Sequence, residues 1–409
     1  MKFFHISDIH FGKTYKNRLV ENSKILIKAQ RRAFEKMVRI AIAYQVEGVL
    51  IAGDLFHTNE VSIHDERFII NAFSELNDAG IKVFYCSGNH DYTDSDSKVR
   101  QIKYPQNVHT FFNDVAQVFE DDKGYRVVSC GHNNKHEMRD LISSFPCFSD
   151  GVVTIGLGHS MVSSSSLTDG SEGDYMATSV EALKATSYDY WALGHIHKAG
   201  QIDPFLPCYY SGSLSGISSK EIGPKGGYLV EFVDGRVQDV EFVQCSEVTW
   251  IRAEIEVDRS IREIDKLYDQ LLKTIKKETR GINANQSIFI IVTMKGTSCL
   301  AVALENEKLR SEIESHLSEE SGCLSVELRH AMKQVVDKEK IFQDEGLVKE
   351  IAQNFKDKEK RDLLLEVLME ETLFDIENTK DKRDYIENIL EENYERIVSY
   401  LLGEDHGNK

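Results

Sequence analysis

The sequence predicts an α/β protein, and three features of its pattern lead to that fold class. Short apolar segments of strand length alternate with helical stretches through about residue 245. Polar residues of the kind that bind ligands come directly after several of these apolar segments. The pattern then changes to a second strand-and-helix region and a final charged helical region. The predicted fold therefore has two packed sheets, or one large sheet, covered by helices, followed by a small α+β domain and a helical C-terminus.

The first predicted domain, residues 1–245, is built from alternating strands and helices. Residues 3–6 are apolar and are followed by polar residues, as expected of a short buried strand. Residues 30–44 and 68–76 carry apolar side chains at three- and four-residue spacing, so each stretch is expected to be a helix with one apolar face. The further expected strands cover residues 49–52, 82–86, 126–130, 152–157 and 189–193.

A hairpin is expected at the end of this domain. Residues 228–232 and 237–243 both have strand character, and Asp234-Gly235 between them is a typical turn pair. The pattern changes after the hairpin, and residues 246–332 are expected to form a separate small α+β domain. Within it, residues 250–257 alternate between apolar and polar side chains, as in a half-buried strand.

The last predicted domain, residues 333–409, has a helical and highly charged sequence. Between residues 385 and 401, apolar side chains recur every three or four positions and form one stripe. A helix of this kind either packs on its own domain or docks on a partner protein. The sequence leaves both interpretations open.

Composition indicates an acidic globular protein of the cytoplasm. Of the 409 residues, 41% are hydrophobic, and the seven cysteines include no CxxC pair, so no disulfide framework or zinc finger is expected. The N-terminus has no long apolar segment, so no signal peptide is expected. No apolar run approaches the ~20 residues needed to cross a bilayer, so no membrane partner is expected. The net charge of −18 counts against nucleic-acid binding. Bound divalent ions would reverse the sign of the local field, so the charge leaves the substrate open.

Five short motifs carry the chemistry, and each comes at the end of a predicted strand. In chain order they are Asp8-Ile9-His10, Gly53-Asp54, Gly88-Asn89-His90-Asp91, Gly158-His159 and Gly194-His195-Ile196-His197. Each is a weak signal alone, but together they supply carboxylate, amide and imidazole donors without a thiolate. That donor set suits Mn²⁺, Fe²⁺ or Zn²⁺. Because ligands of α/β folds gather at the carboxyl ends of strands, the five loops are expected to converge on one metal site.

The glycines and one aspartate of the motifs have specific expected roles. Gly53, Gly88, Gly158 and Gly194 would permit sharp turns and a close approach of backbone segments. Asp54 is the best candidate for a carboxylate that bridges two ions about 3.5–4 Å apart. Such a pair holds a phosphate oxygen, lowers the pKa of a bound water and stabilises the charge that develops on phosphorus. An ion pair held in this way would suit chemistry at a phosphate group.

The five motifs resemble those of the calcineurin-like metallophosphoesterase family. The segments around them are similar to the branch of this family that contains the SbcD/YhaO-type DNA repair exonucleases. That closer similarity rests on residues 10–13, 53–57, 188–197, 210–214 and 225–231. The resemblance covers residues 1–245 and implies a two-sheet sandwich flanked by helices. It also implies that the small α+β domain caps the site.

The resemblance further implies a role for each motif residue. The implied metal ligands are Asp8, His10 and His197 for a first ion, Asn89, His159 and His195 for a second, and Asp54 for both. His90 would stabilise the transition state or protonate the leaving oxygen as a general acid. Asp91 would hold the imidazole of His90. His57 resembles a second histidine near the phosphate in the nucleases, although a surface or helix-capping role also fits it.

Three functions fit these observations, and the first is the leading hypothesis. By resemblance, the chain would be a two-metal DNA exonuclease and endonuclease of DNA repair, with Mn²⁺ as the favoured ion. It would form a homodimer and act with an SbcC-like coiled-coil ATPase that binds the C-terminal helices. The alternative enzyme is a metallophosphoesterase acting on a small nucleotide or another non-DNA phosphoester, which the acidic charge favours. The third function, an interaction protein with an incidental site, needs a separate reason for inactivity, because no ligand position is missing.

Overall fold

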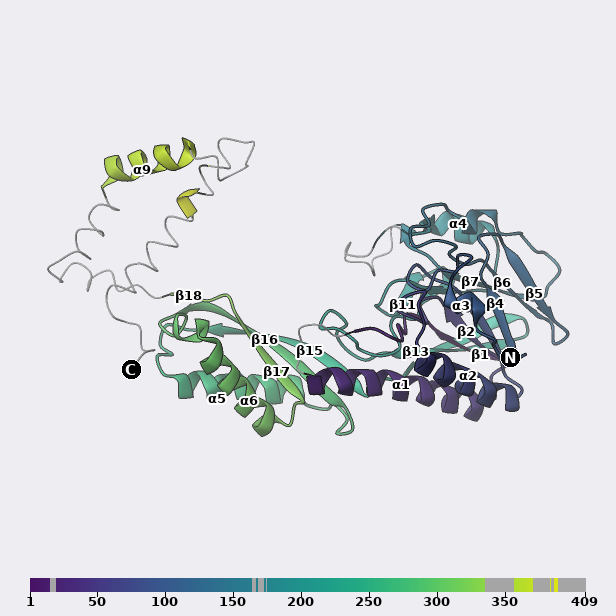
Figure 1. Cartoon of the computed structure of the whole chain (residues 1–409), viewed down its shortest axis with the longest axis horizontal. Helices are drawn as coiled ribbons and strands as arrows, with labels where there is room; N and C mark the ends of the chain where they lie inside the picture. The colour runs from purple at the N-terminus through teal and green to yellow at the C-terminus, as the bar shows by residue number, and fades with distance from the viewer. Residues whose placement is uncertain are drawn as a thin grey trace. The chain divides into compact units, whose positions relative to one another are not determined.

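The computed structural model describes residues 1–14, 20–163, 167, 173, 175–334, 357–370, 383 and 386–388. The chain divides into two compact units (Figure 1), residues 1–251 with 283–287 and residues 252–282 with 288–409. In the last predicted domain, the described part includes helix α9 (Lys358–Glu370). Most of the apolar stripe predicted over residues 385–401 lies outside the described residues.

The first sheet of the first unit is mostly parallel and has an antiparallel hairpin at one edge. Its strands, in spatial order, are β14 (Arg236–Gln244), β13 (Gly226–Val233), β1 (Lys2–Ile6), β2 (Gly48–Ala52), β3 (Lys82–Cys86) and β4 (Val108–Phe111). Strands β1 to β4 run parallel, and β13 pairs with β1 in the antiparallel sense. The carboxyl ends of β1, β2 and β3 therefore lie along the same edge of the sheet.

The second sheet has the same general plan. Its strands, in spatial order, are β11 (Gly200–Asp203), β12 (Leu206–Tyr210), β10 (Tyr190–Gly194), β7 (Val153–His159), β6 (Tyr125–Ser129) and β5 (Gln117–Asp121). The four central strands are parallel, and both edge strands are antiparallel to their neighbours. A further small sheet pairs β8 (Val162–Ser163) with β9 (Thr178–Ser179).

Apolar side chains from both sheets fill the space between them. Phe3 and Phe84 come from the first sheet, and Tyr125 and Tyr190 come from the second; all four are fully buried in one cluster. The neighbour of Phe3 on β1, Phe4, packs in a different cluster with the residues of the covering helices. Because both faces of the central strands are covered, their sequences are continuously apolar. The two-sheet sandwich expected from the sequence is confirmed.

Helices cover the outer faces of the sandwich. Figure 1 shows α1 (Val20–Ala43) and α2 (Ile63–Asp78) together on one side of the unit and α4 (Val180–Ala185) on the other. The apolar face of α2 consists of buried residues at helical spacing, including Ile69, Phe73 and Leu76. The short helices α3 (Lys98–Gln101) and η1 (Ile142–Ser144) complete the unit. The predicted helices at residues 30–44 and 68–76 thus correspond to α1 and α2.

The predicted hairpin is also present. Strands β13 and β14 pair in the antiparallel sense, and Asp234 and Gly235 connect them with φ angles of 49° and 76°. Two successive positive φ angles are those of a type I′ turn, whose twist matches the twist of the flanking strands.

The described part of the second unit contains most of a four-stranded sheet, with helices packed beside it, and helix α9. The strands are β15 (Val248–Val257), β16 (Ser287–Ser298), β17 (Ser325–His330) and β18 (Lys333–Gln334), and the helices are α5 (Ile264–Glu278), α6 (Glu307–Ser321) and the short η2 (Ala303–Glu305). Strands β16 and β17 are parallel, so α6 serves as the crossover that parallel neighbours require. Leu267, Leu271 and Ile275 form the buried face of α5.

Candidate metal centre

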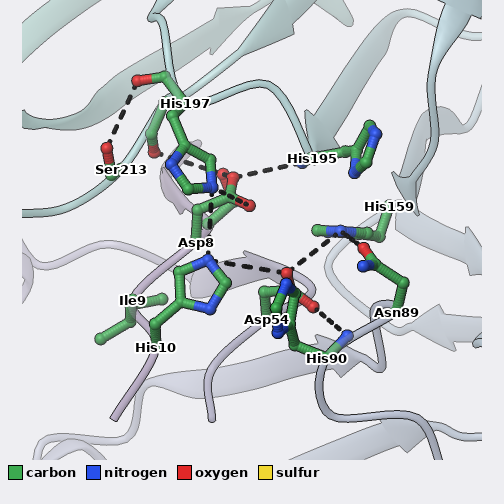
Figure 2. A network of polar contacts seen from close by, with 12 residues as sticks. Asp8, Ile9, His10, Asp54, Asn89, His90, His159, His195, His197 and Ser213 are labelled. Atoms are coloured by element: carbon green, nitrogen blue, oxygen red, sulfur yellow. Dashed lines mark hydrogen bonds and ion pairs between the residues drawn. The ribbon is translucent and has the colours of Figure 1, made fainter. Parts of the chain in front are cut away.

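The residues of the five motifs lie at the carboxyl ends of the central strands of both sheets (Figure 2). Asp8, Asp54 and Asn89 follow β1, β2 and β3 of the first sheet. His159 is the last residue of β7 and His195 follows β10, both in the second sheet. Parallel strands bring their carboxyl ends to one edge, so each sheet contributes one row of ligands.

Four of the predicted ligands have a strained backbone. Asp8, His10, Asp54 and His195 have φ angles of 51°, 57°, 52° and 100°. Such angles are uncommon outside glycine and concentrate at functional sites, where surrounding contacts hold them. The contacts are present here, since the main-chain N–H groups of Ile9 and His10 both donate to the carbonyl of Asp54 at 2.9 Å.

Three of the motif glycines, Gly53, Gly88 and Gly194, are required by the close approach of neighbouring segments. A Cβ atom on Gly194 would lie 1.9 Å from the carbonyl oxygen of Ala52. A Cβ atom on Gly53 would lie 2.3 Å from Nδ1 of His159, and one on Gly88 would lie 2.3 Å from Oδ1 of Asp54. Gly158 differs from this expectation: it lies inside β7, and a Cβ there would meet its nearest side chain at 3.4 Å, an ordinary contact. The role predicted for Gly158 was therefore wrong.

The first predicted ion site is a cluster of three donors with an unsatisfied oxygen. Oδ2 of the buried Asp8 accepts from the hydroxyl of Ser7 and from the main-chain N–H of His195, whereas Oδ1 has no hydrogen-bond partner. Oδ1 lies 3.7 Å from Nε2 of His197, and Nε2 of His197 lies 3.3 Å from Nε2 of His10. An unpaired buried oxygen is costly, and a cation held by these three groups would satisfy it. The residues present therefore fit a divalent ion.

Asp54 lies between this cluster and the residues predicted for the second ion. Its Oδ2 is 3.7 Å from Nε2 of His10 and 3.5 Å from Nε2 of His159. Its Oδ1 accepts from the main-chain N–H of His90 at 2.9 Å, which fixes the carboxylate. This placement is compatible with the bridging role expected for Asp54.

The second group of predicted ligands comes together less completely. Oδ1 of Asn89 lies 3.0 Å from Nε2 of His159, whose Nδ1 contacts the carbonyl of Ala52 at 2.9 Å. The ring of His195 is 5.3 Å from that of His159, centroid to centroid, and its Nε2 contacts the carbonyl of Gly173 at 2.7 Å. Among the described residues, three sets of donor atoms lie within 4.8 Å of one another, and His195 belongs to none of them. Its Nδ1 is the nitrogen left to act as a ligand.

Two further histidines, His57 and His90, lie next to the proposed ligand His10. Their rings are stacked with centroids 4.9 Å apart, and both lie close to His10. Nδ1 of His90 donates to the main-chain carbonyl of His57 at 3.0 Å, which leaves its Nε2 for a substrate. Burial, followed by His90 and Lys13, lowers the pKa of His57 to about 4, so its ring is neutral at pH 7.

Asp91 has a different role from the one expected. It does not hold the imidazole of His90, which bonds to the carbonyl of His57 instead. Its fully buried carboxylate accepts from the hydroxyl of Tyr85 and from a set of main-chain N–H groups, those of Asp54, Leu55, Phe56 and Gly88. Asp91 thus ties the second motif loop to the third.

Several residues that support the ligands escaped the sequence interpretation. Glu221 contacts Nδ1 of His197 at 3.0 Å, and the amine of Lys225 donates to the carbonyl of His197 at 2.7 Å. The side-chain amide of Gln30, on α1, donates to the carbonyl of His10 at 3.0 Å. None of these three residues belongs to the five motifs, and each is separated from its partner by at least 20 residues. Lys225 lies in the segment 225–231 that carries the closer resemblance, but residue types and spacing do not identify the partner of any of the three.

The pKa values of two proposed ligands, His10 and His159, suit metal binding. Burial lowers the pKa of His10 and of His159 well below the usual value, so both imidazoles are neutral at pH 7. Metal ions bind neutral imidazole, so these two rings need not lose a proton first. Burial acts in the same direction on His197, but Glu221 together with Asp8 and Asp54 outweighs it and raises the pKa of His197 to about 9, so this ring has to lose a proton when an ion binds.

A two-sheet sandwich with carboxylate and imidazole donors at the strand ends is compatible with a metal-dependent phosphoesterase. Residues 1–199 match the family model of the calcineurin-like phosphoesterases. These residues form a calcineurin-like metallophosphoesterase domain, and the chain is a metal-dependent phosphodiesterase of the hydrolase class.

Three curated proteins illustrate the relationship. The uncharacterized metallophosphoesterase YhaO of Bacillus subtilis is 28% identical over 68% of this chain and 68% of its own length. The DNA double-strand break repair protein Mre11 of Methanopyrus kandleri is 22% identical over 80% of this chain and 75% of its own. SbcD, a component of the nuclease SbcCD of Escherichia coli K12, is 25% identical over 59% of this chain and 67% of its own.

The described helices include none with the length and apolar character needed to span a membrane.

Proposed function

We propose that this chain is a two-metal DNA nuclease of double-strand break repair, with exonuclease and endonuclease activity and with Mn²⁺ as its ion. The observation that carries the proposal is the convergence of donors from both sheets on Asp54, next to the unpaired Oδ1 of Asp8. Asp8, His10 and His197 would hold the first ion, and Asn89, His159 and His195 the second. Their mixture of nitrogen and oxygen donors suits Mn²⁺.

The proposed hydrolysis depends both on the ions and on the two neighbouring histidines, His57 and His90. When bound, the ion pair supplies a water of lowered pKa and neutralises the charge of the phosphate. His90 would give a proton from Nε2 to the leaving oxygen, because its Nδ1 is committed to the carbonyl of His57. His57, stacked on His90, would contact a phosphate oxygen from the same side. Asp91 would act indirectly, by keeping the loops of Asp54 and Asn89 together.

The preference for DNA is supported by the relatives. Two of the three named above are described as a component of a nuclease and as a DNA repair protein. By the same relationship, we infer a homodimer that works with an SbcC-like coiled-coil ATPase in the cytoplasm. Residues 246–332 would cap the site, and residues 333–409 would bind the ATPase.

A second candidate function is hydrolysis of a small nucleotide or another non-DNA phosphoester. The net charge of −18 favours it, because polynucleotide binding normally depends on a positive surface. The same metal centre would serve either substrate, since fold and metal site do not determine the substrate.

A cleavage assay with two substrates separates these possibilities. The full-length protein is incubated with end-labelled duplex and single-stranded DNA, and separately with bis-p-nitrophenyl phosphate, each with Mn²⁺ or with EDTA. Asp54→Ala and His90→Gln variants are tested beside the wild type, with the exposed His64→Gln as the matched control. We expect Mn²⁺-dependent cleavage of DNA that is lost in the first two variants and retained in the control.

Other results would change the proposal in different ways. Hydrolysis of bis-p-nitrophenyl phosphate with intact DNA would support the small-substrate alternative, unless addition of the ATPase partner restores DNA cleavage. Cleavage that persists in Asp54→Ala would reject the assigned centre. A protein that binds Mn²⁺ but cleaves neither substrate would favour the interaction protein.

A further inference from the structure

A buried carboxylate outside the motifs contacts one of the proposed ligands. Glu221 lies in the loop between β12 and β13 and is 4% exposed. Its Oε1 accepts from Nδ1 of His197 at 3.0 Å and from the hydroxyl of Ser218 at 3.3 Å. Its Oε2 accepts from the main-chain N–H of Ile217 at 2.9 Å. Because both oxygens are held, the carboxylate presents a fixed acceptor to the imidazole.

This contact decides which nitrogen of His197 can bind an ion. When Nδ1 carries a hydrogen that it donates to Glu221, Nε2 keeps its lone pair. Nε2 faces the cluster, 3.7 Å from the unpaired Oδ1 of Asp8 and 3.3 Å from Nε2 of His10. A carboxylate on the far nitrogen of a ligating imidazole orients the ring and makes the ligating nitrogen more basic.

The same loop also holds the main chain of His197. Lys225, which is 5% exposed, donates to the carbonyl of His197 at 2.7 Å. Glu221 and Lys225 therefore hold the side chain and the main chain of the same histidine.

Two other proposed ligand histidines contact main-chain carbonyl oxygens, which are neutral acceptors. His159 contacts the carbonyl of Ala52 at 2.9 Å, and His195 contacts the carbonyl of Gly173 at 2.7 Å. Hydrogen bonds to an ionised acceptor are roughly twice as strong as those to a neutral one. The first site therefore contains an imidazole that is more basic than those of the second site.

We propose that Glu221 is a positioning residue that fixes the tautomer of His197 and makes the first ion site the tighter of the two. The inference rests on the proposed ligand role of His197. The Glu221→Gln substitution keeps the shape and a hydrogen-bond acceptor but removes the charge. We expect it to weaken Mn²⁺ binding at the first site about 10- to 100-fold and to leave the second site unchanged.

The two sites are measured separately by removing one at a time in the full-length protein. His159→Gln leaves the first site, and Asp8→Asn leaves the second. Glu221→Gln is added to each background, and Mn²⁺ is titrated into the metal-free protein while electron paramagnetic resonance reports the free ion. Glu221→Asp, which keeps the charge, is the conservative variant and is expected to bind more tightly than Glu221→Gln. Glu231→Gln, which changes a partly exposed surface carboxylate paired with Lys2, is the matched control.

The outcomes distinguish the two proposals. A loss confined to the background that retains the first site supports the role of Glu221. Unchanged affinity there, or an equal loss in both backgrounds, overturns it, while Mn²⁺ binding by the wild type still supports the proposed function. Absence of any Mn²⁺ binding by the wild type rejects the proposed function itself and this inference with it.

Discussion

At the residue scale, His90 is proposed to act on the substrate, whereas its neighbour Asn89 is proposed to hold an ion. The main-chain N–H of His90 donates to Asp54 at 2.9 Å, and its Nδ1 donates to the carbonyl of His57 at 3.0 Å. Neither contact uses Nε2, so this nitrogen is left for a substrate. The proposed assignment separates proton transfer from ion binding, although both functions come from the same loop.

We therefore expect His90→Gln to retain Mn²⁺ affinity and to lower kcat by about 10²–10⁴, the usual contribution of a general acid. Steady-state kinetics with DNA and Mn²⁺ titration of the same protein would measure the two properties. His64→Gln, an exposed histidine on α2, controls for the loss of an imidazole. A variant that loses Mn²⁺ affinity in parallel with kcat would show that His90 supports the ions instead.

Single residues also show where sequence interpretation reaches its limit. Asp8, Asp54 and His159 could be assigned because each belongs to a short motif at a strand end. The partner of His90 could not, because a main-chain carbonyl leaves no trace in residue types. Glu221 was missed because its contact with His197 is set by the path of the loop after β12, which sequence spacing does not encode.

At the element scale, the loops at the strand ends approach so closely that Gly88, like Gly53 and Gly194, leaves no room for a side chain. A Cβ at Gly88 would lie 2.3 Å from Oδ1 and 2.9 Å from the main-chain nitrogen of Asp54, neither of which can move without displacing the proposed bridge. Gly158 lies within β7, where the nearest atoms to a Cβ are side-chain carbons at 3.4 Å and 3.5 Å. The two glycines look equivalent in sequence but not in structure.

The comparison of Gly88→Ala with Gly158→Ala tests this difference. We expect Gly88→Ala to abolish high-affinity Mn²⁺ binding, because the carboxylate of Asp54 must shift. Gly158→Ala should keep Mn²⁺ affinity within about threefold and change stability by only about 1 kcal/mol, the scale of a tolerated core change. Calorimetric titration with Mn²⁺ measures both variants, and similar losses in the two would argue against the steric explanation.

The central strand β1 contains a buried histidine that links stability to pH. His5 faces the space between the sheets, with Nδ1 3.0 Å from the hydroxyl of Tyr190 and Nε2 3.1 Å from the carbonyl of Leu193. Burial lowers the pKa of His5 to about 3, from a usual value of 6.5. The unfolded chain therefore binds a proton between these values that the folded chain does not bind. The contribution of His5 to stability is complete above pH 6.5 and is lost as the pH falls toward 3.

We expect the free energy of unfolding of the metal-free wild type to fall more steeply with acid than that of His5→Gln. The slope from His5 is at most about 1.4 kcal/mol per pH unit, so urea titrations at about pH 7.5 and about pH 5 should differ by about 2 kcal/mol more in the wild type. Using both proteins without metal cancels the titration of the ligand histidines. Equal changes in the two proteins would show that His5 is already protonated in the folded state or exposed to water.

The helices and strands that could be predicted are those with regular spacing of apolar residues. The helices α1 and α2 and the β13–β14 hairpin follow from apolar spacing and from the Asp234-Gly235 turn. Strands β5 and β11 were not predicted, because each lies at a sheet edge and is partly exposed to solvent, so it lacks the continuous apolar run of a buried strand. The partition into two sheets could not be derived from periodicity either, since it depends on which strands pair.

At the scale of the whole molecule, an acidic chain has to bind a polyanion for the proposed function to hold. The net charge of −18 repels phosphate at long range, and salt at about 0.15 M screens that repulsion beyond about 8 Å. Two divalent ions at the strand ends would make the centre itself attractive to a phosphate that comes within that distance. DNA affinity should therefore depend on the ions to a degree that is unusual for a DNA-binding protein with a basic surface.

We expect the metal-free protein to bind duplex DNA weakly at about 0.15 M salt and Mn²⁺ to strengthen binding by at least about tenfold. Fluorescence anisotropy with a non-hydrolysable phosphorothioate duplex would measure this without cleavage. Asp54→Asn, which weakens the proposed bridge, should lose most of the gain, whereas His64→Gln should keep it. Tight binding by the metal-free protein would instead indicate that side chains hold the DNA backbone. The ions would then be needed for hydrolysis alone, and the acidic charge would no longer favour a small substrate.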